Sequence, residues 1–148
     1  MLNAITPFLF ILCPADDPVR VTVVIVLATS NNAMIDPKLT DLAKEVQKRE
    51  PKLTGFQLSE SMGKSIPIGE SHTFELMEKQ ELQVKVEKQK DANGHISLTI
   101  KPPGLEKITY GCVCGKFFPV VTPHQTKTGE VLIIAVMAKP CTAGKKKD

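Results

Sequence analysis

The chain has 148 residues, of which 42% are hydrophobic and 24% are charged, and its formal net charge is +3. A chain of this length and composition can bury a single core without metals or disulfides, which excludes intrinsic disorder as its general state. No stretch reaches the ~20 consecutive apolar residues of a membrane-spanning helix, so a protein with several membrane spans is also excluded.

The first fifteen residues are expected to form a secretory signal peptide. Residues 1–15 contain an apolar run and end in a small residue just before Asp16. This pattern predicts cleavage after residue 15 and an exported, periplasmic or extracellular protein. A buried N-terminal strand is the alternative, because the run is short and has no basic residue. Lipidation at Cys13 fits poorly, because Leu12 stands where a small residue is needed.

Two segments are predicted to be central strands of a sheet. Val19–Thr29 and Val131–Lys139 are rich in β-branched residues and become apolar on both faces. A strand that is buried on both faces lies inside a sheet covered by another layer. We therefore expect these two strands to lie near each other at the centre of the sheet.

One helix is predicted, between residues 36 and 50. Asp36 is a suitable N-cap, Pro37 suits the first turn and Pro51 ends the helix. The apolar face consists of Leu39, Leu42, Ala43 and Val46. This helical spacing predicts that the helix covers one face of the sheet.

The remainder of the chain has the period-two pattern of β-strands, beginning at Phe56. Leu82–Lys88 and His95–Ile100 are predicted to form a hairpin with a three-residue loop, a left-handed Gly94 and Val86 opposite Ile100. In the next segment, we expect one strand face to carry Ile108, Tyr110, Cys112 and Cys114. Phe117–Val121 is predicted to be an edge strand or a bent strand, because it contains Pro119. The polar segment Thr122–Glu130 is predicted to be a loop.

The predicted fold is a single α+β domain over residues 16–143, with a mainly antiparallel sheet of about six strands and one helix packed on one face. Residues 144–148 form a basic tail with three lysines and one aspartate, which supplies +2 of the net charge of +3. The body is nearly neutral, so no nucleic-acid partner is expected.

Several segments resemble small exported bacterial proteins of unassigned function. The resemblance rests on residues 17–21, 35–39, 53–56, 68–70 and 131–134 and extends over most of the expected mature chain. It implies export and a β-α-then-β layout. The shared segments are structural in character and imply no catalytic residues.

The cysteines offer three interpretations. In an oxidising compartment, Cys141 pairs with Cys112 or Cys114 in a disulfide, while a direct bond between Cys112 and Cys114 is disfavoured by their spacing on a strand. Alternatively, the three thiols and His124 hold zinc or copper, although their spacing matches no standard motif. The third interpretation is that the thiols are buried and only pack.

No complete catalytic signature is present, so no enzymatic activity is predicted. A nucleophile elbow and a zinc-protease motif are both missing, and His72, His95 and His124 lie in separate segments. The expected function is therefore that of an exported, non-enzymatic module that binds an unknown protein or envelope component. Phe117 and Phe118, beside Pro119, are the predicted contact, and burial of both in the core is the alternative.

Overall fold

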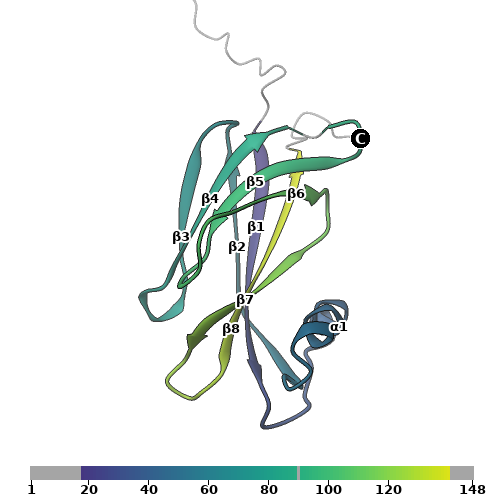
Figure 1. The fold of residues 1–148 in the computed structure, drawn as a ribbon, viewed down its shortest axis with the longest axis vertical. Coiled ribbons are helices and arrows are strands. Elements are labelled where there is room, and N and C mark those ends of the chain that lie inside the picture. Colours follow the sequence, from purple (N-terminus) through teal and green to yellow (C-terminus); the bar gives the residue numbers. More distant parts are fainter. Residues whose placement is uncertain (1–17, 90, 141–148) are drawn as a thin grey trace, which may run out of the picture.

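The structure, a computed structural model, describes residues 18–89 and 91–140, and in this part of the chain eight strands form two antiparallel sheets (Figure 1). Sheet A has the order β2-β1-β8-β7 and sheet B the order β3-β4-β5-β6. The strands of sheet A are β1 (Val19–Thr29), β2 (Gly55–Ile66), β7 (Phe118–Gln125) and β8 (Val131–Pro140). Those of sheet B are β3 (Ser71–Glu75), β4 (Glu81–Lys88), β5 (His95–Lys101) and β6 (Ile108–Val113). The expected signal peptide, the basic tail and Cys141 lie outside the described residues.

The prediction that the first and last apolar segments are central neighbours is confirmed. β1 pairs with β8 from Val19 opposite Pro140 to Ala28 opposite Val131, and each has a further strand on its other side. Alternate residues of both strands are buried on opposite faces of sheet A. This double burial explains why neither segment alternates cleanly between polar and apolar residues.

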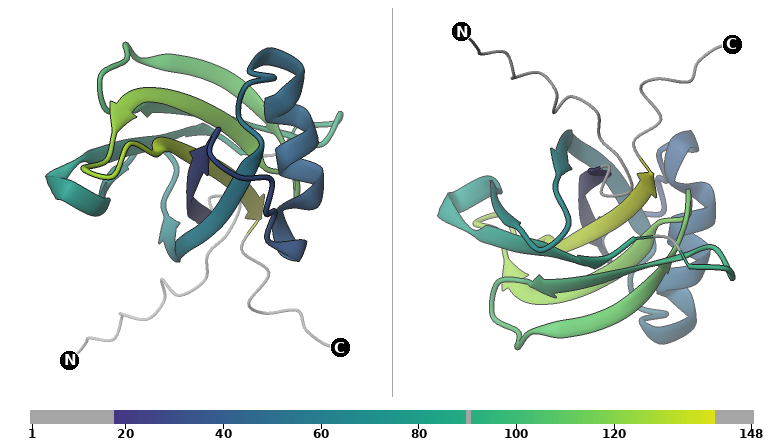
Figure 2. Two further views of the ribbon diagram at one scale, coloured as in Figure 1. Left: turned by 90° about the horizontal axis from the view of Figure 1, so that it is seen from below. Right: turned by 90° about the horizontal axis from the view of Figure 1, so that it is seen from above.

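The two sheets enclose the main core. Inward-facing side chains of β1 and β8 meet those of β4 and β5, and Figure 2 shows the two layers from both ends. The fully buried members include Val21, Ile25, Leu82, Val84, Ile96, Leu98, Ile100, Leu132 and Ile134. The prediction of about six strands in one sheet is therefore wrong in count and layering. Alternation shows that a strand has a buried face, but it does not show which sheet shares that face.

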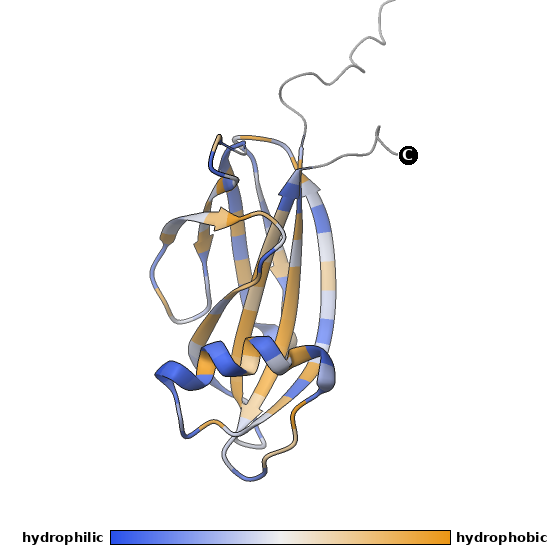
Figure 3. Ribbon diagram, turned by 90° about the vertical axis from the view of Figure 1, so that its right-hand side faces the viewer, coloured by the Kyte–Doolittle hydropathy of each residue, from blue (hydrophilic) through white to orange (hydrophobic). Residues whose placement is uncertain are grey.

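The helix lies on the outer face of sheet A, as predicted. A short 3-10 turn, η2 (Pro37–Leu39), leads into α1 (Thr40–Arg49), and Oδ1 of Asp36 accepts a hydrogen bond from the backbone N of Lys38 at 3.0 Å. Buried Ala43 and Val46 anchor the helix in a second core that lies between α1 and sheet A. Figure 3 shows that α1 runs across the strands at one end of the sheet.

The hairpin of β4 and β5 has a different register from the one predicted. Val86 lies opposite Leu98, Val84 lies opposite Ile100, and a bulge interrupts the pairing after Val86. The left-handed Gly94 is confirmed, with φ of 82°. The register is displaced by two residues, which keeps both apolar sets on the same face, so the period-two pattern fits either register.

Two local predictions around β6 and β7 are only partly right. Ile108, Tyr110, Cys112 and Cys114 all pack against the main core, but β6 ends at Val113 and Cys114 lies in the turn that follows. The predicted loop at Thr122–Glu130 is partly strand, since β7 continues to Gln125. The buried Thr122 hydroxyl donates to the carbonyl of Leu132 at 2.7 Å, which lets a polar residue continue the strand.

Tyr110 and Phe118 link the two sheets where β6 and β7 form neighbouring edges. Their rings stack with centroids 4.1 Å apart. The Tyr110 hydroxyl is buried and has no hydrogen-bond partner among the described residues. Burial, with a smaller effect from the nearby Cys112 thiol, raises the pKa of Tyr110.

Replacing Tyr110 by phenylalanine is expected to leave the free energy of unfolding unchanged or to raise it by about 1 kcal/mol. The ring contacts remain, and a buried hydroxyl without a partner no longer has to lose its water. Urea unfolding of Tyr110→Phe and the wild type measures the difference. A loss of stability above about 1 kcal/mol contradicts the assignment of an unpaired hydroxyl.

Candidate functional site

The outer face of sheet A contains an apolar groove of about 290 Å³ beside α1. The sheet supplies Leu58 from β2, Val24 from β1 and Ala135 from β8, and Phe117 comes from the residue just before β7. Three adjacent strands of sheet A, and the residue just before the fourth, therefore line the groove.

The helical side of the groove comes from the segment that begins α1. Leu39 is buried, Leu42 is half-buried, and both face the groove together with Lys38. The polar side chains at the groove are those of Lys38 and Ser61, so nearly all of the lining is aliphatic or aromatic. A surface of this kind binds apolar side chains or small apolar groups.

Only one of the two predicted contact residues lies at this groove. Phe117 is 41% exposed, whereas Phe118 is half-buried against the main core and stacks on Tyr110. Successive residues of an extended segment point to opposite faces, which separates the two phenylalanines. Of the two interpretations from the sequence, burial in the core thus applies to Phe118, and exposure at the surface applies to Phe117.

The same face carries positive charge beyond the groove. Arg20 and Lys139 are directly opposite each other on β1 and β8, and both are exposed. Neither residue, nor Lys38, forms an ion pair within residues 18–89 and 91–140. Like charges directly opposite each other in a sheet repel, so this part of the face favours an anionic neighbour.

Of the groove lining, the sequence indicated only Phe117, and it did not indicate the pair of cations. One signal was available, because Arg20 is the charged residue within the central strand Val19–Thr29. That Arg20 faces a second cation, Lys139, depends on the register of β1 with β8, which the sequence does not specify.

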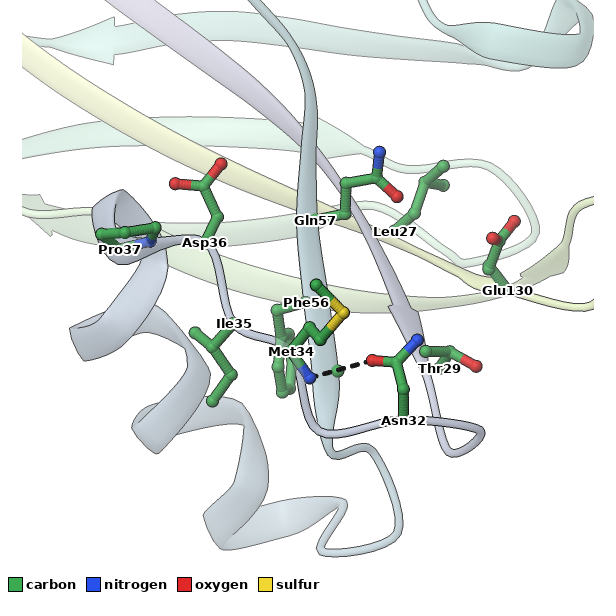
Figure 4. Close-up of a pocket in the computed structure, with 11 residues that line it drawn as sticks. Leu27, Thr29, Asn32, Met34, Ile35, Asp36, Pro37, Phe56, Gln57 and Glu130 are labelled. Atoms are coloured by element: carbon green, nitrogen blue, oxygen red, sulfur yellow. Dashed lines mark hydrogen bonds between the residues drawn. The ribbon is translucent and has the colours of Figure 1, made fainter.

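A second cavity, of about 440 Å³, lies where the segment after β1 crosses the start of β2 (Figure 4). Ile35 forms a parallel bridge with Phe56, and Oδ1 of Asn32 accepts a hydrogen bond from the backbone N of Met34 at 2.9 Å. A Cβ atom at Gly55 would collide with Oδ1 of Asn32, so a larger residue there would displace the Asn32 side chain.

The carboxylates at this second cavity already have partners. Asp36 caps η2, and Oε1 of Glu130 accepts hydrogen bonds from the hydroxyls of Thr126 and Thr128. No histidine or cysteine lines the cavity. Its polar groups hold the surrounding loops in place.

His124 forms a polar contact between the two sheets. Its Nε2 lies 2.8 Å from Oε1 of Glu78, and the backbone N of Lys127 donates to Oε2 of Glu78 at 3.2 Å. These two hydrogen bonds lower the pKa of Glu78, the bond with His124 having the larger effect. Glu78 has φ of 54°, and Lys79 has φ of 64°. A backbone conformation that L-residues rarely adopt is thus held by contacts across the sandwich.

The structure does not bring His124 to the cysteines. Gly115, beside Cys114, donates to the carbonyl of Ala138 near the end of β8, whereas Gln125, beside His124, is paired with Val131 at its start. Seven residues of strand separate these points by ~23 Å. Within the described residues, no group of three His, Cys, Asp or Glu side chains is arranged to hold a metal ion.

Cys112 and Cys114 form no disulfide with each other or with another described residue. Cys112 is buried, and that burial raises the pKa of its thiol. Cys114 is half-buried, and its backbone N donates to the carbonyl of Gly94 at 3.0 Å. The predicted pairing of either thiol with Cys141 falls outside the described residues.

The other two histidines occupy separate places. His72 lies within β3, where its ring meets Phe74 edge-on with centroids 4.8 Å apart. His95 begins β5 and lies 4.0 Å from Oδ1 of Asp91 in the preceding turn. Neither residue lines the groove or the second cavity.

In the part of the chain that the structure describes, no helix is long and apolar enough to cross a membrane. No family model, curated protein or solved structure matches this chain.

The contact between Glu78 and His124 is expected to make stability depend on pH. Because the folded-state pKa of Glu78 lies below its ordinary value of 4.5, the contact stabilises the fold above pH 4.5. That stabilisation is lost as the pH falls through the lowered pKa. Urea unfolding of the wild type and Glu78→Gln should differ at pH 7 and converge at pH 3.

Glu81→Gln, an exposed change at the start of β4, serves as the matched control. A difference between the wild type and Glu78→Gln that is the same at both pH values contradicts a contribution from the ionised carboxylate.

Proposed function

We propose that this protein is an exported, non-enzymatic binding module that recognises an acidic amphipathic helix of a protein partner. The recognition surface is the groove on the outer face of sheet A. The observation that carries the proposal is the exposed Phe117, which faces an apolar groove lined by residues of β2, β1, β8 and the helical segment.

The shape of the groove favours a helix as the occupant. α1 has ten residues, is ~15 Å long, and lies across a four-stranded sheet that is ~14 Å wide between its outer strands. A second helix of about the same length fits alongside α1 on the same sheet. Its apolar stripe contacts the exposed Phe117 and the half-buried Leu42 and Leu58, above the buried floor of Val24 and Ala135.

The charges favour an acidic partner. Such a helix lies between α1 on one side and the opposed Arg20 and Lys139 on the other, since this pair lies four residues along β1 and β8 from Val24 and Ala135. Lys38 adds a cation at the groove itself. Acidic residues on the flank of the helix relieve the repulsion between Arg20 and Lys139 and speed the encounter of the two proteins.

The same geometry disfavours a membrane surface as the partner. α1 projects from the outer face of sheet A beside the groove (Figure 2). A planar surface therefore meets α1 before it reaches the buried groove floor of Val24 and Ala135.

Selection of twelve-residue helical peptides from a display library, with the folded protein as the target, tests this proposal. We expect selected peptides to carry an apolar stripe at helical spacing, flanked by Asp and Glu. Phe117→Asp should weaken their binding at least tenfold, because it places a charge in an apolar contact.

Val113→Asp is the matched control, since Val113 is 45% exposed but does not line the groove. Arg20→Glu combined with Lys139→Glu should also weaken the acidic peptides. Peptides whose binding survives Phe117→Asp, or tighter binding to phosphatidylglycerol vesicles than to any peptide, would refute the proposal.

Export is the second element of the proposal, and it rests on the composition of residues 1–15. The intact mass of protein recovered from its native host should correspond to a chain that begins at Asp16. Recovery of a chain that begins at Met1 from the cytosolic fraction contradicts export and leaves the groove proposal standing.

A further inference from the structure

Sheet B carries a second and chemically different hollow on its outer face. This cavity of about 240 Å³ is lined entirely by polar side chains, three of which are lysines. The lining residues are Ser71, Gln83, Lys85, Thr99, Lys101 and Lys107. We call it the lysine pocket.

Strand register explains why the three lysines converge. Lys85 on β4 lies opposite both Ser71 on β3 and Thr99 on β5. Two residues farther along the same face, Gln83 on β4 lies opposite Lys101 on β5. Lys107 comes from the segment just before β6. Lysines from three separate elements thus surround one small volume.

Two of the three ammonium groups are held in place. Nζ of Lys101 donates to the backbone carbonyls of Leu105 and Pro102, which are neutral acceptors and leave its charge uncompensated. Nζ of Lys85 lies 3.7 Å from Oε1 of Glu87, whose other oxygen accepts a hydrogen bond from the Thr99 hydroxyl at 2.7 Å. Positions fixed in this way reduce the entropy lost when a ligand binds.

The charge of the pocket indicates the kind of anion. Three lysines and the adjacent Glu87 give a net charge of +2, and no carboxylate lines the cavity itself. A phosphate monoester carries a charge of about −1.5 to −2 at pH 7, and its oxygens accept several hydrogen bonds. A sulfate ester or a phosphodiester carries a single negative charge and matches this charge less well.

We propose that the lysine pocket binds a phosphate monoester on a sugar or other polyol. The lining contains no aromatic or large aliphatic side chain on which a nucleobase or an acyl chain can pack. Ser71 and Gln83 supply the polar groups that pair with ligand hydroxyls, while the Thr99 hydroxyl already bonds to Glu87 and Thr109. This site lies on the opposite sheet from the groove and does not depend on the function proposed for that groove.

Titration calorimetry at low ionic strength, with amide NMR to locate the site, tests this proposal. The probes are glucose 6-phosphate, glucose 6-sulfate, glucose and adenosine monophosphate. We expect glucose 6-phosphate to bind most tightly and to shift the amides of β4 and β5 around Lys85 and Lys101. Lys101→Gln should weaken its binding about tenfold or more, because it removes a charged hydrogen-bond donor.

Lys64→Gln is the matched control, because Lys64 is an exposed lysine on β2 that does not line the pocket. Thr99→Val keeps every lysine and should weaken binding less than Lys101→Gln does. Equal affinity for the sulfate and the phosphate, equal effects of Lys64→Gln and Lys101→Gln, or no shifts at millimolar glucose 6-phosphate would each overturn the proposal. Tighter binding of adenosine monophosphate would overturn the assignment to a sugar or polyol.

Discussion

The pairing of β1 with β8 supports the rest of the structure. Ten consecutive residue pairs join these strands; their inner face is buried, and their outer face is buried under α1 but carries the exposed Arg20 and Lys139 farther along. Their inner face closes the main core against sheet B, and their outer face receives α1. A strand pair covered on both sides contributes apolar burial to two cores at once, which makes it the least replaceable part of the sandwich.

The candidate groove follows from how α1 covers that pair. The helix needs only a few apolar contacts, at Leu39, Ala43 and Val46, and these occupy one end of the outer face. Val24 and Ala135 belong to the same core as α1 and form the buried floor of the groove, and the register of β1 with β8 places Arg20 opposite Lys139 beyond it. The apolar character and the positive charge of this face thus come from the same pair of strands.

The sequence was sufficient for features that depend on local pattern. It predicted the two central strands, the Asp36 cap and the left-handed Gly94, because burial on two faces, capping and turn chemistry all leave local signals. It did not predict the two-layer arrangement, the hairpin register or the position of Cys114, since these depend on which strands meet. The groove and the lysine pocket were missed for the same reason, because each gathers residues from at least three separated segments.

Hydrogen exchange of backbone amides in the native state tests the central role of the β1 and β8 pair most directly. We expect amides of β1 and β8 to exchange only through global unfolding, with the free energy that urea unfolding gives. Amides of α1 and of the edge strand β2 should exchange at lower free energy through local opening. Protection of α1 equal to that of β1, or faster exchange in β8 than in β2, would contradict this account.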